Sequence, residues 1–122
     1  MAKEADFQAV FDQLKMVMKA YEDRLEIKAD QPGDYSVDTH YRRKDGYQYA
    51  FGAVQIKKNY VSYHLVPVYS FPEILEGISP ELKKRMQGKA CFNFKNLNPE
   101  QLEELGELTR KGFERFKAEG FI

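Results

Sequence analysis

Apolar and polar residues alternate through residues 47–69, YQYAFGAVQIKKNYVSYHLVPVY, and the alternation is interrupted at Lys58-Asn59. Period-two alternation is typical of β-strands, so this stretch predicts two long strands joined by a two-residue turn. Asn59 is expected to supply one of the left-handed backbone positions that such turns use. A three-residue loop would mix the two faces of the hairpin. The predicted cross-strand pairs are Ile56 with Val61, Val54 with Tyr63, and Gly52 with Leu65.

This register places both apolar and polar residues on the second face of the hairpin. One strand contributes Tyr49, Phe51, Ala53, Gln55 and Lys57, and the other contributes Val68, Val66, His64, Ser62 and Tyr60. A hairpin with one solvated face needs only one apolar side. We therefore expect a helix, a second subunit or a ligand to cover the second face.

The residues before the hairpin predict one helix and two strands. Apolar residues at spacings of three and four form a stripe from about residue 4 to residue 21, which is the pattern of an amphipathic helix. The stripe consists of Phe7, Val10, Phe11, Leu14, Val17, Met18 and Tyr21. From Leu25 to Tyr41 the period is two, with turn residues at 31–34 and again at 42–46, so an antiparallel meander is expected.

The residues after the hairpin predict a short helix and a fifth strand. Ser79-Pro80 is a cap followed by a proline, which opens a helix that Gly88 can close. Residues 89–95 alternate, with Ala90, Phe92 and Phe94 on one side and Cys91 and Asn93 on the other. The aromatic side is expected to face the core.

A final helix is expected to begin at Asn98, because Asn98 and Gln101 have the spacing of a capping box. Gly120 fits its C-terminal cap, and Phe121 would then fold back onto Phe116. Together these elements predict an α+β fold with two layers. An antiparallel sheet of about five strands would carry the N- and C-terminal helices on one face, in a single domain over residues 1–122.

The composition of the chain limits the classes of protein to which it can belong. The chain has 122 residues and a single cysteine, which excludes an intramolecular disulfide. Its start lacks the layout of a secretory signal, and no apolar run approaches the roughly 20 residues that span a bilayer. A cytoplasmic protein without a membrane partner is expected.

The net charge is zero, but the charge is unevenly distributed. Residues 41–95 carry 10 bases and 4 acids, whereas the segments on either side are acidic. The basic run at Lys83-Lys84-Arg85, with Lys89, stands near Phe92 and Phe94 and is reminiscent of a nucleic-acid surface. Because these aromatic residues alternate as core residues do, nucleic acid is not the expected partner.

The stretch FGAVQIKKNYVSYHLVPVY, followed by ISPELKKRMQGKACFNF and a capped final helix, resembles the YdhG-like family of small bacterial domains of unknown function. The resemblance covers roughly residues 47–119. It implies an α+β sandwich with a frataxin-like shape, and an iron-related role attached to some members. It supplies no settled catalytic residues.

The candidate ligand-binding residues lie on the second hairpin face: Tyr49, Phe51, Gln55, Ser62 and His64, joined by Asn93 or Cys91 if the fifth strand pairs alongside. Aromatic walls with a few converging polar groups are typical of a small-molecule pocket. The alternatives are a homodimer or other protein interface on this face, or a cover formed by residues 71–78. A ligand-binding or protein-interaction module is therefore the expected function.

Catalysis and metal binding are less favoured by the sequence. Ser62 and His64 have no acid on either strand, and Cys91 is expected to be an inert core residue, so an enzyme of unknown reaction is an alternative only. No cofactor is expected. The frataxin-like resemblance implies a second alternative, weak iron binding through exposed carboxylates of the first helix, for which Asp6, Asp12 and Glu22 are the candidates.

Overall fold

The computed structural model describes the backbone of residues 2–122 and the side chains of residues 7–122. Within these residues, six strands form one antiparallel sheet in the order β1-β2-β3-β4-β6-β5. The strands are β1 (Glu26–Gln31), β2 (Asp34–Arg42), β3 (Gln48–Ile56), β4 (Val61–Leu65), β5 (Met86–Gln87) and β6 (Cys91–Phe94). The α-helices are α1 (Ala2–Lys19), α2 (Val66–Ser70), α3 (Pro80–Lys83) and α4 (Pro99–Ala118), with 3-10 turns η1 (Glu22–Arg24) and η2 (Pro72–Leu75).

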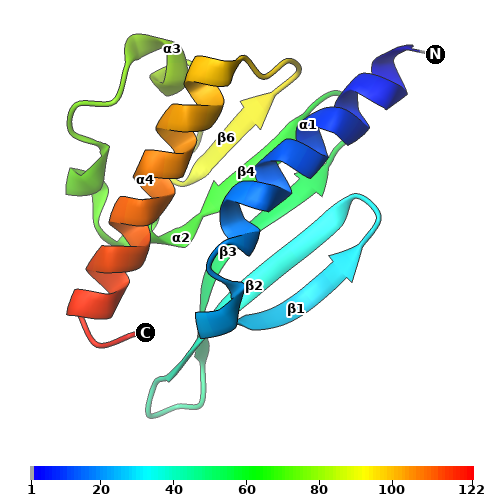
Figure 1. Cartoon of the computed structure of the whole chain (residues 1–122). Coiled ribbons are helices and arrows are strands. Elements are labelled where there is room, and N and C mark those ends of the chain that lie inside the picture. Colours follow the sequence, from blue (N-terminus) through cyan, green and yellow to red (C-terminus); the bar gives the residue numbers. More distant parts are fainter. Residues whose placement is uncertain (1) are drawn as a thin grey trace.

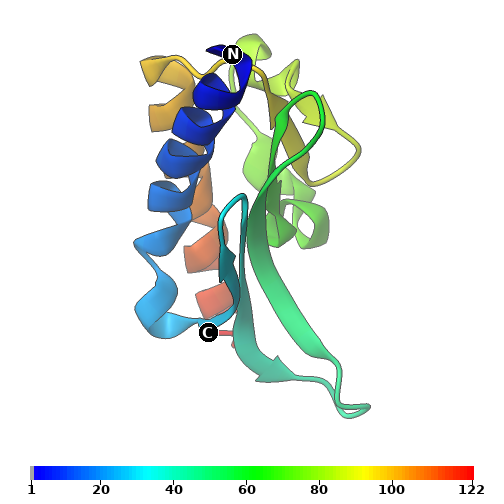
Figure 2. The ribbon, with the colours of Figure 1, turned by 90° about the vertical axis from the view of Figure 1, so that its right-hand side faces the viewer.

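The long helices α1 and α4 lie side by side on one face of the sheet (Figures 1 and 2). The expected two-layer α+β fold is confirmed, with a sixth strand in addition to the five expected. The apolar stripe of α1 is buried against the sheet, and Leu14 and Met18 are fully inaccessible. The opposite face of the sheet, which these helices leave uncovered, contains the second hairpin face. No helix within residues 2–122 is long and apolar enough to cross a membrane.

Helix α4 is fixed at both ends by the capping contacts that the sequence predicts. The Asn98 side chain accepts a hydrogen bond from the Gln101 backbone, and the Gln101 side chain accepts one from the Asn98 backbone. At the C-terminus Gly120 has a φ of 88°, and the Phe121 N–H donates to the Phe116 carbonyl at 2.8 Å. The Phe121 ring lies 5.2 Å from the Phe116 ring, as a Schellman motif favours.

The register of the central hairpin is the predicted one. Gly52 pairs with Leu65, Val54 with Tyr63, and Ile56 with Val61. The turn is closed by a hydrogen bond from the Lys57 N–H to the Tyr60 carbonyl at 2.7 Å. The expected left-handed backbone at Asn59 is wrong, because within residues 2–122 positive φ angles occur at glycines only. The turn is therefore made without the primed geometry that a two-residue loop usually takes.

A β-bulge in β3 changes the faces of two residues assigned to the candidate site. Val37 pairs with Gly52 and Asp38 pairs with Ala50, so Phe51 is an extra residue in β3. An extra residue reverses the alternation beyond it. Phe51 is fully buried under the helices, with its ring 6.1 Å from the rings of both Phe113 and Phe116. The predicted placement of Phe51 on the second hairpin face is wrong.

Tyr49 follows Phe51 onto the helix-bearing face for the same reason. Its ring lies 4.9 Å from Phe121 and 5.1 Å from Tyr41. Thr39, which is fully buried, donates from its hydroxyl to the Tyr49 carbonyl at 2.9 Å and accepts from the Tyr41 N–H. The bulge is thus held by side-chain contacts from β2 and from the end of the chain, and Tyr49 lies outside the second hairpin face.

The second strand of the hairpin is shorter than the alternation predicts. β4 ends at Leu65, and Val66–Ser70 is helix α2, with Pro67 in its first turn. A proline has no N–H to donate to a neighbouring strand, and its fixed φ suits the start of a helix. Val66 and Val68 therefore do not extend the second face.

Residues 71–78 do not cover the second face either. The Phe71 ring lies 5.9 Å from Phe116, and Ile74 lies against Gly112, so this segment packs on α4. The helix that begins after Ser79 ends at Lys83, before the expected stop at Gly88. Met86–Gln87 instead pairs with β6 as the edge strand β5.

Candidate functional site

A polar groove lies on the sheet face opposite α1 and α4, and we call it the sheet groove. It has a volume of about 340 Å³ and runs across four neighbouring strands. Its lining consists of Ala53, Gln55, Lys57, Tyr60, Ser62, His64, Gln87, Cys91 and Asn93. Ala53 pairs with His64 and Gln55 with Ser62, while β6 places Cys91 beside His64 and Asn93 beside Ser62. Strand pairing alone therefore gathers these side chains, because alternate residues of each strand share a face.

Four of the six residues predicted as ligand-binding line this groove: Gln55, Ser62, His64 and Asn93. Tyr49 and Phe51 lie under the helices instead. The groove also contains Lys57, Tyr60 and Gln87, which were not assigned to the site, and Cys91, which was expected there as an alternative to Asn93. The first two share the face that the hairpin register defines, so the sequence pattern already contained that signal. Gln87 was not identifiable, because β5 was expected to be helix.

His64 and Cys91 form a close cross-strand pair at one end of the groove. The His64 Nδ1 atom lies 3.0 Å from the Cys91 Sγ atom. Burial lowers the pKa of His64 below its usual value, which favours the neutral imidazole at pH 7. Cys91 is only half-buried and faces the groove, so its expected place in the core is wrong. A thiol beside a neutral imidazole offers a ligand one donor and one soft polarisable contact.

The remaining polar side chains of the groove have hydrogen-bonding capacity to spare. Gln55 donates to the Asp34 carboxylate at 3.1 Å, which orients its amide at the β2 side of the groove. Within residues 7–122, the side chains of Ser62 and Asn93 make no hydrogen bond to another protein group. Ser62 is nevertheless 9% exposed, so little water reaches it. Donors and acceptors in such a position are available to a bound molecule.

A smaller hollow of about 210 Å³ adjoins the groove at β5, and we call it the cationic hollow. It shares Tyr60, Gln87 and Asn93 with the sheet groove. Its other lining residues are Lys84, Arg85, Met86 and Lys95. Arg85 lies directly beside Asn93, whose N–H donates to the Arg85 carbonyl at 2.8 Å. The polar face of the sheet is therefore continuous with a cluster of positive charge.

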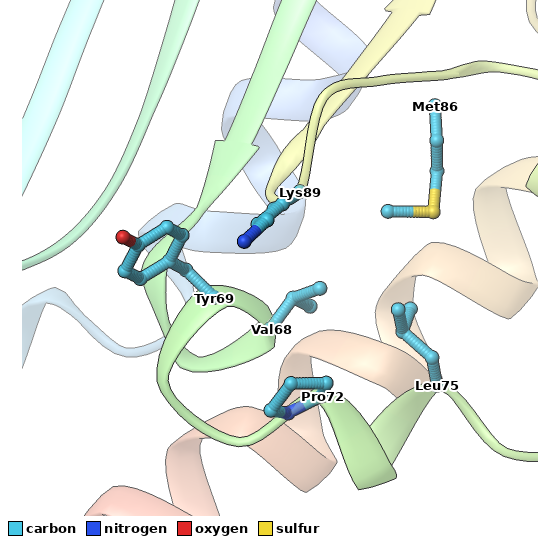
Figure 3. A pocket seen from close by; sticks show the side chains of 6 residues that line it. All are labelled: Val68, Tyr69, Pro72, Leu75, Met86 and Lys89. Atoms are coloured by element: carbon cyan, nitrogen blue, oxygen red, sulfur yellow. The ribbon is translucent and has the colours of Figure 1, made fainter.

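A second site, which we call the edge pocket, lies between α2, η2 and the β5–β6 edge. It has a volume of about 470 Å³ and is lined by Val68, Tyr69, Pro72, Leu75, Met86 and Lys89 (Figure 3). Lys89 is its one charged lining residue, and the Lys89 Nζ atom lies 6.0 Å from the centre of the Tyr69 ring. The sequence pattern did not reveal this pocket, because residues 66–69 were expected to continue a strand.

The carboxylates considered for iron are occupied or lie outside the described side chains. Asp12 accepts a hydrogen bond from Gln8 at 2.9 Å. Glu22 accepts from the Tyr35 hydroxyl at 2.8 Å and from Lys19 at 3.1 Å, and both contacts lower its pKa. Asp6 lies outside the described side chains. Among residues 7–122, no three His, Cys, Asp or Glu side chains are arranged to hold a metal ion.

The two sites differ in chemistry. The sheet groove with its cationic hollow is polar, whereas the edge pocket is apolar with a single cation at its rim.

Comparisons of the chain with protein-family models, with curated proteins and with solved structures found no match. Function is therefore inferred from the side chains that these sites bring together.

Proposed function

We propose that this protein is a binding module whose ligand, a small polar organic molecule, occupies the sheet groove. The observation that supports this most is the convergence of Gln55, Ser62, His64 and Asn93 in one hollow on the sheet face opposite the long helices. A ligand site typically combines a concave surface with a few polar groups that fix orientation. The groove combines both features.

The groove offers a ligand both contact area and direction. Ala53, the smallest residue of the lining, leaves room above the sheet, and the ring of Tyr60 provides an apolar wall. The unpaired side chains of Ser62 and Asn93 can donate to or accept from the ligand. The neutral His64 imidazole adds a further acceptor or donor, according to which ring nitrogen carries the proton. A ligand that carries both hydrogen-bonding groups and one flat apolar part fits this lining.

A fragment screen read by two-dimensional NMR tests the proposal. Polar fragments are expected to shift the backbone resonances of Ser62, His64, Cys91 and Asn93 together. The variant Ala53→Leu adds the Cγ and both Cδ atoms of leucine to the hollow and is expected to abolish these shifts. Ala50→Leu is the matched control, since Ala50 lies on the same strand but does not line the groove. Fragments whose shifts map elsewhere, or that bind Ala53→Leu unchanged, would contradict a ligand site in the groove.

The edge pocket supports a second candidate function. Its lining is apolar apart from Lys89, so it suits a small hydrophobic molecule with an anionic end. The same fragment screen distinguishes the two sites. Hydrophobic carboxylates that shift Val68, Leu75 and Met86, and that bind the Lys89→Gln variant less tightly, would assign ligand binding to the edge pocket.

A further inference from the structure

We propose that the ligand of the sheet groove is a small organic oxyanion, a phosphate monoester or a carboxylate, whose charged group lies at the cationic hollow. This inference rests on the proposed function, because it names the chemical class of the molecule that the groove would bind. It is carried by the charges that line the groove and the hollow, and by the lack of partners for those charges.

The combined lining of the sheet groove and the cationic hollow contains four cations and no carboxylate. The cations are Lys57, Lys84, Arg85 and Lys95. Lys57 follows β3, Lys84 and Arg85 precede β5, and Lys95 follows β6. The fold therefore brings together charges that are far apart in the sequence. Asp34, which accepts a hydrogen bond from the lining residue Gln55, lies outside the lining itself. Lys84, Arg85 and Lys95 line the cationic hollow and Lys57 lines the adjoining groove. Like charges gathered in this way repel one another, and a bound anion relieves that repulsion.

None of these four cations forms an ion pair within residues 7–122. The ion pairs of this part of the chain use other bases, such as Lys15 with Asp30 and Arg115 with Glu73 and Glu119. Elsewhere in residues 7–122, six of the fourteen lysine and arginine side chains form ion pairs, whereas none of the four at the groove and hollow does.

Arg85 gives the sharpest indication of a missing partner. Its Nε atom is inaccessible to solvent and has no hydrogen-bond acceptor, and it is the one buried side-chain polar atom within residues 7–122 in this condition. A buried N–H without an acceptor costs about 1–3 kcal/mol. Guanidinium groups bind carboxylates and phosphates through paired N–H donors, so an oxyanion in the hollow would satisfy the Nε–H group once the Arg85 side chain turns toward it. Asn93 and Gln87, which line both the groove and the hollow, add neutral amide donors.

A small molecule is favoured over a nucleic acid by the placement of the aromatic residues. Sequence-tolerant nucleic-acid binding uses exposed rings on which bases stack. Phe92 and Phe94, the rings nearest the basic residues in sequence, are fully buried in the core, so the lining of the groove and the hollow contains a single tyrosine, Tyr60, and no phenylalanine or tryptophan. The volume of the groove suits a ligand at the small end of the usual range for organic molecules.

The test compares three probes that share one ring: phenyl phosphate, benzoate and benzyl alcohol. Each is titrated into the full-length protein and followed by NMR. Phenyl phosphate or benzoate is expected to shift Arg85, Asn93 and Lys95 resonances, and benzyl alcohol to bind at least about tenfold more weakly because it lacks the charge. Raising NaCl from about 0.1 M to about 1 M is expected to lower the affinity for the two anions and to leave the affinity for benzyl alcohol unchanged.

Two variants link this binding to the hollow. The double variant Arg85→Gln, Lys95→Gln is expected to bind the anionic probes with an affinity lower by about tenfold or more. Lys44→Gln removes one charge from the exposed β2–β3 loop and is expected to have no effect. Cys91, the single cysteine of the chain, gives a second readout, since an anion in the groove is expected to slow its alkylation by iodoacetamide.

The outcomes separate this inference from the proposed function. Binding of phenyl phosphate alone supports a phosphate monoester, and binding of benzoate alone supports a carboxylate. Benzyl alcohol that shifts the groove as strongly as the anions, without salt dependence, contradicts the oxyanion inference and leaves the groove a ligand site. If none of the probes binds, the oxyanion inference fails, and the fragment screen decides the proposed function. A single-stranded oligonucleotide that binds through Arg85 more tightly than phenyl phosphate overturns the inference of a small molecule.

Discussion

Individual polar side chains of this protein occupy two contrasting environments. In the core, the fully buried Tyr63 hydroxyl lies 2.6 Å from the Thr109 hydroxyl, which donates in turn to the Leu105 carbonyl. Tyr63 is therefore the donor of its pair, and burial raises its pKa. In the groove, His64 and Cys91 contact each other but remain half-exposed. The first pair stabilises the packing of α4 on the sheet, and the second is accessible to a ligand.

His64 makes stability depend on pH, and the sign follows from the direction of its pKa shift. Burial lowers the folded-state pKa below the unfolded value of about 6.5, so the unfolded chain binds more protons between the two values. The stabilisation is complete above about pH 6.5 and is lost as the pH falls toward the folded pKa. Urea unfolding between pH 5 and pH 8 is expected to show this loss, and His64→Gln to remove it.

Proton titration by NMR checks the same prediction directly. His64 is expected to titrate below about pH 6.5. The variant His40→Gln assigns the resonance and is expected to keep the pH dependence that His64→Gln abolishes. A His64 pKa above about 6.5 would contradict the burial argument.

Among the elements, α4 shows how closely its neighbours approach it. Two of its glycines have the same helical propensity but different surroundings. A Cβ atom at Gly106 would meet nothing within 4 Å, whereas one at Gly112 would lie 2.9 Å from the Cβ atom of Pro67. Pro67 is held in the first turn of α2, so it cannot rotate away. Gly112 therefore allows α2 to approach α4 closely.

The two glycines provide a matched pair of substitutions. Gly106→Ala is expected to raise the free energy of unfolding by about 0.5–1 kcal/mol, because alanine favours the helix. Gly112→Ala is expected to lower it by about 1–3 kcal/mol, because the methyl group collides with Pro67. Denaturant unfolding measures both. Equal effects of the two substitutions would show that α2 yields freely and that the contact with Pro67 does not matter.

At the scale of the whole molecule, the two faces of the sheet have different surroundings. One face is covered by α1 and α4, which together bury the aromatic core (Figure 2). The opposite face carries the sheet groove and, at the β5 edge, the cationic hollow. A symmetric dimer through this second face would place Lys57, Arg85 and Lys95 of both copies in one interface. Burying unpaired like charges in an interface is unfavourable.

We therefore expect this face to remain free of a second copy. Light scattering at millimolar protein concentration and low salt is expected to give the mass of a monomer, 14.3 kDa. A dimer whose formation is abolished by Ser62→Arg in the groove, but not by Lys44→Gln, would show that the face is an interface.

Much of this fold follows from local patterns in the sequence. The stripe on α1, the capping box at Asn98 and the Schellman contact of Phe121 each depend on residues close together in the chain. The hairpin register is equally local, because a slip of one residue would turn every apolar side chain of the strand to the wrong face. This register, with the alternation of β6, was sufficient to bring Gln55, Ser62, His64 and Asn93 together.

The features decided by tertiary structure alone depend on contacts between distant segments. The bulge at Phe51 turns Phe51 and Tyr49 toward Phe113, Phe116 and Phe121, which lie more than sixty residues away in the chain. Burial of these rings offsets the strand hydrogen bonding lost at the bulge. A strict alternation pattern assumes continuous pairing, so it does not predict the bulge. In the same way, β5 forms because β6 offers it an edge, although its own sequence favours the end of a helix. The alternation of apolar and polar residues thus determined which hairpin side chains share the groove face. The cations and the other lining residues come from strands and loops that meet only in the folded chain.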